Sequence, residues 1–272
     1  MQGDVFLDEY SRDENIARYV SRTAGAGIAY VLARVYAPIY GKAISAVAAE
    51  RPAQHAYRVL EYGCGGGMNL LKLIELLESQ GRRWERAVGA DFSPPMVEAA
   101  RKEAAEHLPP AWNARITFVT ARNETLMADL SRGLGAAREE LRRSFDFVVG
   151  VNTIRYSHRL GKAEDTVRDL YELLRPGGYS VMIDMNRRFP FFRSRMRDRR
   201  RPRQETYIPS LEEYVRPFRS AGFGIMESGN FCWIPHSARP RMLALCRRAS
   251  PFLDACFSPF AMRSLVVARR PG

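Results

Sequence analysis

The feature that most constrains this chain is a strand-like run, a glycine-rich turn and a helix-like run in direct succession, VLEYGCGGGMNLLKLIELL at 59–77. Glycine is needed at Gly63, Gly65 and Gly67 because the chain must turn sharply and its backbone must approach a ligand closely. A dinucleotide fingerprint would require a further glycine where Met68 stands, and the GK[ST] end of a phosphate-binding loop is absent. The segment therefore predicts an α/β fold with a nucleotide-like ligand at this turn.

The rest of the chain alternates between short apolar runs and amphipathic stretches, which indicates a mostly parallel sheet with helices on both faces. We predict one α/β domain at 55–272 with a Rossmann-like, seven-stranded sheet. The expected strands are 57–62, 86–91, 115–120, 145–151, 178–184, 223–227 and 263–268. The expected helices between them are 68–80, 94–107, 162–174 and 210–220.

Three segments lie outside this alternation. Residues 1–54 are predicted to form an N-terminal helical cap, in which apolar residues recur at helical spacing and Pro38 breaks or kinks the helix. Residues 187–209 form an arginine-rich insertion after the fifth strand, and residues 234–260 an apolar insertion between the last two strands. Insertions at strand ends lie over the sheet edge where ligands bind, so both are candidate cover elements.

Most of the net charge of +12 comes from one segment of the chain. Residues 187–203 carry nine arginines against one acid, Asp198, and so hold +8 of that charge. Only four of the 42 basic residues are lysines, a bias typical of an arginine-favouring genome. The four cysteines form no CxxC pair, the apolar runs are too short to span a bilayer, and the acidic N-terminus lacks a secretory signal. We therefore expect a cytoplasmic protein with free thiols, no membrane span and no bound metal.

The glycine turn also carries an acid at a fixed distance, in the pattern Glu61-x-Gly63-x-Gly65-x-Gly67. This pattern resembles motif I of the class I, Rossmann-like, S-adenosylmethionine-dependent methyltransferases, of the type that acts on small molecules. The resemblance covers roughly residues 55–185. It implies that S-adenosylmethionine is the cofactor and that Glu61 lies near its methionine moiety.

A second acid, Asp91, ends the next expected strand 30 residues later. A carboxylate there can accept hydrogen bonds from both ribose hydroxyls. The resemblance places Phe92 against the adenine and begins a helix at the Ser-Pro pair that follows. Where the family carries an adenine-reading acid after the third strand, this chain has Arg122. Asn123 is our substitute because its amide can both donate and accept, and Glu124 is the alternative.

The segment after the fourth strand, FDFVVGVNTIRYSHRL, is where the family places residues beside the transferring methyl group. Asn152 is expected to present its carbonyl, and its side chain as well, to the amino end of the cofactor. His158, which titrates near neutrality, and Tyr156 are the catalytic candidates. Arg155 could bind an anionic substrate group or form a salt bridge across the loop.

Further candidates lie nearby. Asp184 and Asn186 end the fifth strand and could face the pocket or form a turn. Arg187 is a candidate substrate ligand at the start of the arginine-rich insertion. That insertion could clamp an anionic group of a small substrate, bind a nucleic-acid backbone, or form a solvated lid. The apolar insertion could wall a substrate pocket or cover a second subunit. The resemblance also implies a tyrosine of the cap near the cofactor, with Tyr10, Tyr19 and Tyr30 as candidates.

We therefore predict an S-adenosylmethionine-dependent methyltransferase. It would transfer a methyl group by in-line displacement to an O, N or C atom of a small, partly apolar and possibly anionic metabolite, plausibly in secondary metabolism. The first alternative is an RNA or protein methyltransferase that uses the arginine-rich insertion. The second is a non-catalytic scaffold that kept cofactor binding. A homo-oligomer is compatible with all three.

Overall fold

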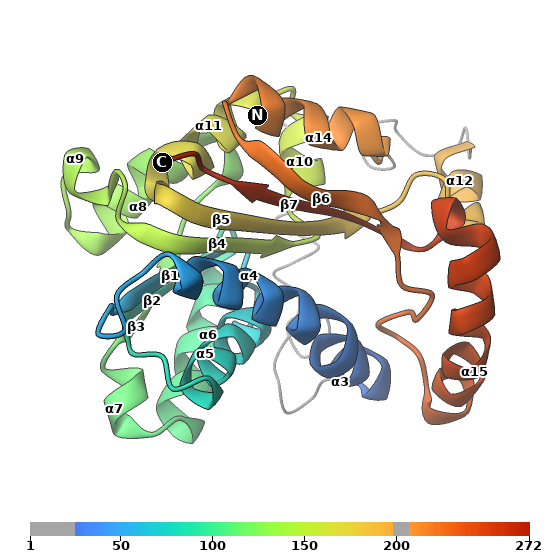
Figure 1. Ribbon diagram of the computed structural model, residues 1–272, viewed down its shortest axis with the longest axis horizontal. Coiled ribbons are helices and arrows are strands. Elements are labelled where there is room, and N and C mark those ends of the chain that lie inside the picture. Colours follow the sequence, from blue (N-terminus) through green and yellow to red (C-terminus); the bar gives the residue numbers. More distant parts are fainter. Residues whose placement is uncertain (1–24, 198–206) are drawn as a thin grey trace.

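Seven strands form one twisted sheet, in the order β3-β2-β1-β4-β5-β7-β6, within the computed structural model, which describes residues 25–197 and 207–272 (Figure 1). β7 runs antiparallel to β5 and β6, and the other neighbouring pairs are parallel. The expected seven-stranded, mostly parallel sheet is therefore confirmed. The strands are β1 (Tyr57–Tyr62), β2 (Trp84–Asp91), β3 (Ile116–Thr120), β4 (Phe145–Val151), β5 (Leu174–Met185), β6 (Gly224–Phe231) and β7 (Arg263–Arg269).

Helices cover both faces of the sheet, because neighbouring strand residues point to opposite sides and both sides are apolar. Val59 and Leu60 of β1, for example, are both fully buried but belong to different core clusters. One face packs against α4 (Ala37–Ala49), α5 (Met68–Ser79) and α6 (Pro94–His107). The other packs against α8 (Leu126–Leu134), α11 (Ala163–Leu173) and α14 (Leu211–Ser220), and Figure 1 shows the two layers.

Several elements differ from the expected ones. β5 begins at Leu174, so the Pro-Gly-Gly run lies within the strand, and a pairing irregularity between Phe145 and Phe147 of β4 accommodates it. Short helices with few apolar residues gave no periodic signal. These are α7 (Pro110–Asn113), η2 (Asn123–Thr125), α9 (Arg138–Leu141), α10 (Ile154–Arg159), α12 (Pro190–Arg197) and η3 (Ser258–Phe260).

The N-terminal helix is continuous through the expected break. α3 (Ala26–Val31) leads into a π-helical stretch, η1 (Leu32–Tyr36), and then directly into α4. Pro38 lies in the first turn of α4, where a wider preceding turn accommodates a residue that cannot donate a backbone hydrogen bond. α4 packs against α5 and β5 as part of a helical layer, so within residues 25–54 of the N-terminal segment only α3 and η1 contribute to a cover at the ends of the strands.

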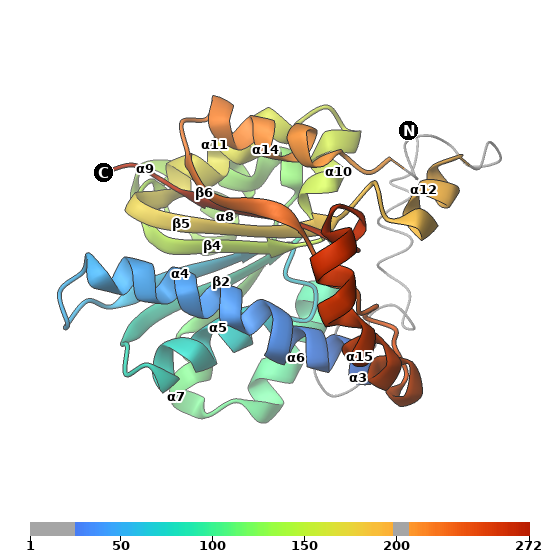
Figure 2. The same cartoon turned by 45° about the vertical axis from the view of Figure 1, so that its right-hand side comes forward.

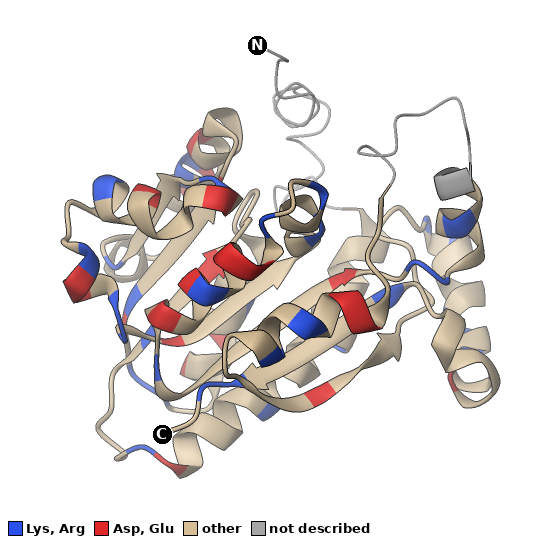
Figure 3. Cartoon of the chain, turned by 90° about the horizontal axis from the view of Figure 1, so that it is seen from above, with Lys and Arg blue, Asp and Glu red and all other residues tan. Residues whose placement is uncertain are grey.

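The second insertion contributes α15 (Pro240–Phe257), which lies beside α3 at one end of the sheet (Figure 2). None of its residues is fully buried, and Leu245 and Phe252 are 68% and 64% exposed. In the arginine-rich insertion, residues 198–206 lie outside the described part of the chain. Figure 3 shows basic and acidic residues mixed along the remaining elements. Among the helices described, none is long and apolar enough to cross a membrane.

Candidate active site

The glycine turn joins β1 to α5 in a conformation that favours glycine. Gly63, Gly65 and Gly67 have φ values of +67°, +50° and +80°. A Cβ on Gly63 would lie 2.0 Å from Cγ2 of Thr153, so a larger residue would displace the segment after β4. The turn can therefore approach a ligand with its backbone, as the sequence predicted.

Asp91 ends β2 directly beside this turn. Its Oδ2 accepts a hydrogen bond from the Gly65 amide at 2.8 Å, and its Oδ1 accepts one from the Ser93 amide at 2.9 Å. Burial raises the pKa of the Asp91 carboxyl to about 6, although these amide donors oppose the rise. The carboxylate is therefore mostly ionised at neutral pH, and it retains lone pairs for further donors.

Glu61 lies within β1, where its side chain is fully buried. Its two carboxyl oxygens accept hydrogen bonds from Nδ2 of Asn69 at 3.0 Å and from the Leu70 amide at 2.8 Å. Burial raises the pKa of Glu61 to about 8, so much of the population carries a neutral Glu61 at pH 7.

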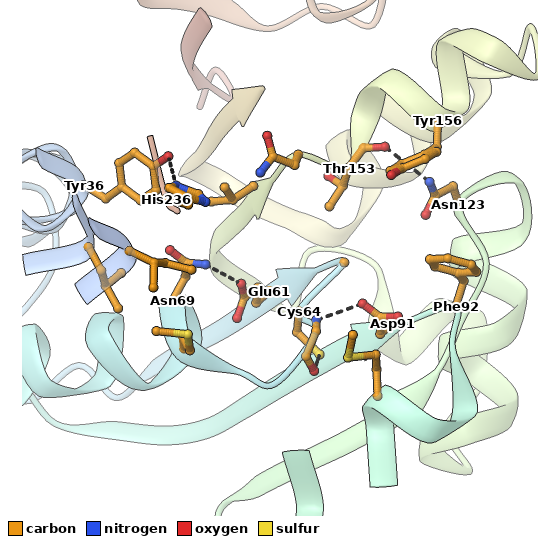
Figure 4. Close-up of a pocket in the computed structure, with 18 residues that line it drawn as sticks. Tyr36, Glu61, Cys64, Asn69, Asp91, Phe92, Asn123, Thr153, Tyr156 and His236 are labelled. Atoms are coloured by element: carbon orange, nitrogen blue, oxygen red, sulfur yellow. Dashed lines mark hydrogen bonds between the residues drawn. The ribbon is translucent and has the colours of Figure 1, made fainter. Parts of the chain in front are cut away.

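These groups line one cavity of about 800 Å³, measured with its open mouth, at the carboxyl ends of the parallel strands (Figure 4). A position at the carboxyl ends of the strands is typical of small-molecule sites in α/β proteins. The residues that line it are Ile28, Leu32, Tyr36, Glu61, Gly63, Cys64, Gly65, Met68, Asn69, Asp91, Phe92, Met96, Asn123, Val151, Asn152, Thr153, Tyr156 and His236.

One end of the cavity carries two aromatic rings. The rings of Phe92 and Tyr156 lie 6.4 Å apart, and Asn123 lies between their segments in Figure 4. The Asn123 side chain is buried, and its Nδ2 donates to the Thr153 carbonyl at 3.4 Å. Among the described residues, the amide oxygen and the second N–H hydrogen of Asn123 have no hydrogen-bond partner, so both are available at this wall of the cavity.

Asn152 is the first residue after β4 and lines the same cavity. It adopts a left-handed backbone conformation, with a φ of +60°, and its amide donates to the Ile183 carbonyl at 2.7 Å. Its side-chain Oδ1 accepts a hydrogen bond from Nη1 of Arg263 at 2.7 Å. The side chain is thus held by β7, and the residue still lines the cavity.

The sequence analysis missed Tyr36 and His236, which close the cavity at the end away from Phe92 (Figure 4). The Tyr36 hydroxyl and His236 Nε2 lie 3.0 Å apart. Gly27 lets the cap helix lie directly against the chain after β6, since a Cβ there would meet the Pro235 carbonyl oxygen at 2.5 Å. No local pattern connects residues 200 positions apart, so sequence reasoning had no signal for this pair.

Other predicted residues do not line this cavity. His158 lies outside its lining; burial lowers the pKa of His158, and its Nε2 has no hydrogen-bond partner among the described residues. Arg155 is buried against Asp184, with Nη1 at 3.1 Å from Oδ1, so the salt-bridge alternative describes the contact found. Arg187 is exposed and pairs with Glu213 at 3.2 Å.

The remaining candidates are placed as follows. Asn186 donates from Nδ2 to the Pro259 and Ala261 carbonyls, so its side chain joins the end of β5 to the segment before β7. Tyr30 faces a different groove, on the far side of the cap helix, and Tyr10 and Tyr19 lie outside the described residues. Of the apolar insertion, only His236 reaches the cavity.

A family model described as a methyltransferase domain matches residues 53–218, more than half of the chain, so the chain belongs to this methyltransferase family. Polyketide synthase 19 of Gibberella fujikuroi is 29% identical over 132 residues, which is 48% of this chain and 4% of that much longer protein. An S-adenosylmethionine-dependent methyltransferase from Mesorhizobium loti is similar in fold, with a TM-score of 0.52, 20% identity, and coverage of 83% of this chain and 96% of that one. The CMeT domain of the citrinin polyketide synthase has a TM-score of 0.55, 15% identity, and coverage of 95% and 56%.

The residues around the cavity fit S-adenosylmethionine, the cofactor that the sequence motifs predict for this methyltransferase domain. Asp91 presents a carboxylate to a cavity wall where hydroxyl donors can be accepted, beside a turn without side chains. Phe92 and Met96 supply apolar surface next to it. When bound, S-adenosylmethionine would supply a methyl group on a positively charged sulfur, already activated for displacement, so the lining residues would be needed only to align the reactants and exclude water.

The raised pKa of Glu61 predicts a pH-dependent stability for the cofactor-free protein. Between the ordinary pKa of 4.5 and the folded value of about 8, the folded state binds the proton more tightly than the unfolded chain. The free energy of unfolding therefore falls as pH rises through this window, with a limiting slope of about 1.4 kcal/mol per pH unit.

Glu61→Gln should flatten that slope, because glutamine does not titrate; its carbonyl oxygen can keep one of the two hydrogen bonds, whereas its amide nitrogen cannot accept the other. Urea unfolding at several values between pH 6 and pH 8 isolates the effect, since Asp91 titrates near 6. Glu98→Gln, at a side chain that is 75% exposed, is the control and should leave the slope unchanged. Equal slopes for Glu61→Gln and the parent protein would contradict the prediction.

Proposed function

We propose that this methyltransferase acts on a small metabolite, at an O, N or C atom, by in-line displacement. The observation that carries the proposal is the construction of the cavity. Ile28, Leu32 and Tyr36 of the cap helix and His236 line the same cavity as the cofactor-side groups Asp91 and Glu61. These four residues would cover the cavity, leave room for a small acceptor beside the cofactor and exclude water from the methyl transfer.

The roles proposed for the lining residues follow from their chemistry. Asp91 accepts the ribose hydroxyls, and Phe92 with Asn123 contacts the adenine. The glycine turn (Gly63, Gly65 and Gly67), with Glu61, holds the methionine moiety, and Asn152 faces the amino end. Of the two catalytic candidates, Tyr156 lines the cavity, with its Oη accepting a hydrogen bond from Nη2 of Arg155 at 2.8 Å, whereas His158 does not line it.

The similarity to part of a polyketide synthase supports a place in secondary metabolism, since those enzymes build small natural products. The apolar lining, with Ile28, Leu32 and Val151, supports a partly apolar acceptor. A macromolecular acceptor would need an open face at the mouth of the cavity, whereas α3 and the chain after β6 lie across it.

The test is transfer of an isotope-labelled methyl group from S-adenosylmethionine into the small-molecule fraction of a host extract. We expect a labelled product whose mass exceeds that of its precursor by one CH₂, detected by mass spectrometry. Label that enters only RNA or protein would contradict the small-metabolite assignment. Cofactor binding without any label transfer would identify a non-catalytic scaffold instead.

A further inference from the structure

The helix α15 lies at one end of the molecule, beside α3, and exposes apolar side chains there (Figures 1 and 2). It packs against α3 and η3, and its half-buried residues Leu243 and Cys246 lie against the main core. Leu245 and Phe252, by contrast, are 68% and 64% exposed. Single exposed apolar residues are ordinary, but several gathered in one place indicate an interaction surface.

The exposed side of α15 combines apolar and basic residues. Its stripe is formed by four residues that follow one another at helical spacing, Arg241, Leu245, Arg248 and Phe252. Leu243, which packs inward, lies on the opposite side of the helix. The stripe therefore alternates a guanidinium with an apolar side chain, and all four residues are exposed.

The exposed apolar surface continues from α15 onto η3 and α12. The rings of Phe252 and Phe257 lie 6.1 Å apart, and the guanidinium of Arg188, which precedes α12, lies 4.9 Å from the ring centroid of Phe260 in η3. Phe257, Phe260 and Phe191 are 45%, 36% and 59% exposed. We call this set of residues the α15 surface: Arg188, Phe191, Arg241, Leu245, Arg248, Phe252, Phe257 and Phe260.

Charge decides which kind of partner the α15 surface fits. The helix α15 contains three arginines and one acid, Asp254, whose Oδ1 accepts a hydrogen bond from Nε1 of Trp233 at 2.9 Å. A second copy of the chain would place the arginines of one helix against those of the other, and like charges in contact oppose association. The surface therefore fits a partner that is negatively charged and also accepts apolar side chains.

An anionic lipid bilayer has both of these properties. Its phosphates attract arginine, and the hydrocarbon just below them accepts leucine and phenylalanine. Arginine side chains are long enough to reach the phosphates while their apolar neighbours are buried. A protein partner would need an acidic groove that encloses parts of α15, η3 and α12, whereas a bilayer needs no preformed shape.

We propose that the α15 surface attaches the protein peripherally to a membrane that contains anionic lipids. The helix α15 lies within the headgroup region, with Leu245 and Phe252 directed to the acyl chains and Arg241 and Arg248 to the phosphates. Because α3 lines the cavity and packs beside α15, attachment brings the cavity close to the lipid. The proposal goes beyond the proposed function and does not rest on it, since attachment is measured without methyl transfer.

The test is co-sedimentation of the full chain with vesicles made of equal parts of phosphatidylcholine and phosphatidylglycerol. We expect binding to these mixed vesicles, and binding at least about tenfold weaker to phosphatidylcholine alone, because the arginines lose their attraction. The double variant Leu245→Ser, Phe252→Ser should bind the mixed vesicles at least about tenfold more weakly, since apolar burial is lost. The matched control is Leu160→Ser, Met226→Ser, at side chains that are 52% and 57% exposed but lie after α10 and in β6. It should bind as the parent protein does.

A second pair of variants tests the charge. Arg241→Gln, Arg248→Gln should weaken binding to the mixed vesicles by about 25-fold, about fivefold for each arginine near the lipid. Its control is Arg132→Gln, Arg168→Gln, which removes the same net charge from side chains of α8 and α11 that are 80% and 63% exposed. This control should change binding by less than about twofold, because charges far from the lipid are screened.

Three outcomes would overturn the proposal, provided that circular dichroism shows each variant to be folded. The first is that the parent protein does not bind the mixed vesicles, which would leave an acidic protein as the partner. The second is that binding depends on Arg241 and Arg248 but not on Leu245 and Phe252, which would show electrostatic attraction without insertion. The third is that sedimentation velocity finds a dimer that Leu245→Ser, Phe252→Ser converts to a monomer; the surface would then bind a second copy.

Discussion

Asp91→Ala should lower the affinity of the protein for S-adenosylmethionine by about 100-fold or more. In the proposed site Asp91 accepts hydrogen bonds from two ribose hydroxyls, and each bond to a charged group contributes about 1.5–3 kcal/mol, with about 1.4 kcal/mol per tenfold in affinity. The substitution also removes the acceptor for the Gly65 amide, which holds the glycine turn in place. Isothermal titration calorimetry with S-adenosylmethionine and S-adenosylhomocysteine measures the loss.

Asp169→Ala provides the comparison. Asp169 is a partly buried acid whose Oδ2 accepts a hydrogen bond from the Met127 backbone amide at 3.0 Å, but it does not line the cavity. The affinity of the Asp169→Ala variant for the cofactor should equal that of the parent protein. The prediction fails if Asp91→Ala binds S-adenosylmethionine within threefold of the parent while its fold, measured by circular dichroism, is intact.

Asp146→Ala should have the largest effect on stability, a loss of about 3–5 kcal/mol in the free energy of unfolding. Asp146 is fully buried near the start of β4, at the opposite end of the parallel strands from the cavity. It accepts hydrogen bonds from His55 Nε2 at 2.9 Å, the Arg58 amide at 2.9 Å and Arg175 Nη1 at 3.0 Å. Removal of the carboxylate leaves these donors without their partner. Partial exposure of His55 and Arg175 places the loss toward the lower value.

Guanidinium unfolding measures this loss, and Asp165→Ala is the control. Asp165 is 49% exposed and pairs with Lys162 and Arg168 on the surface, so its removal should change the free energy of unfolding by less than about 0.5 kcal/mol. At a temperature where Asp146→Ala remains folded, its affinity for the cofactor should be unchanged. A free energy of unfolding equal to that of the control would show that the hydrogen bonds to Asp146 do not stabilise the fold.

Much of the fold was predictable because its signals are local. The strand that ends at Tyr62 and the helix that begins at Met68 were expected at those positions, since apolar periodicity and glycine act over a few residues. Pro38 shows the limit of that reasoning. A proline does oppose a regular helix, yet a π-helical stretch before it kept the helical path continuous, and packing of α4 on α5 stabilises this solution.

The site divides in the same way. Glu61 and Asp91 were found from sequence because each stands at a fixed distance from a strand end. His158 was selected for its chemistry alone, and the structure places it outside the cavity. His236 carries the same imidazole side chain, but it lies in the apolar insertion, and nothing in the neighbouring residues marked it as a residue of the site.

The sequence alone determined the sheet, the glycine turn and the acids that line the cavity, because strand periodicity and turn chemistry are properties of neighbouring residues. Only the tertiary structure decided which distant side chains share the cavity. Tyr36 and His236 come from two segments far apart in the sequence and meet because the cap helix and the chain after β6 close over the same strand ends. Burial then changes the chemistry of His236: it lowers the pKa of this side chain well below its ordinary value, which residue type alone does not show.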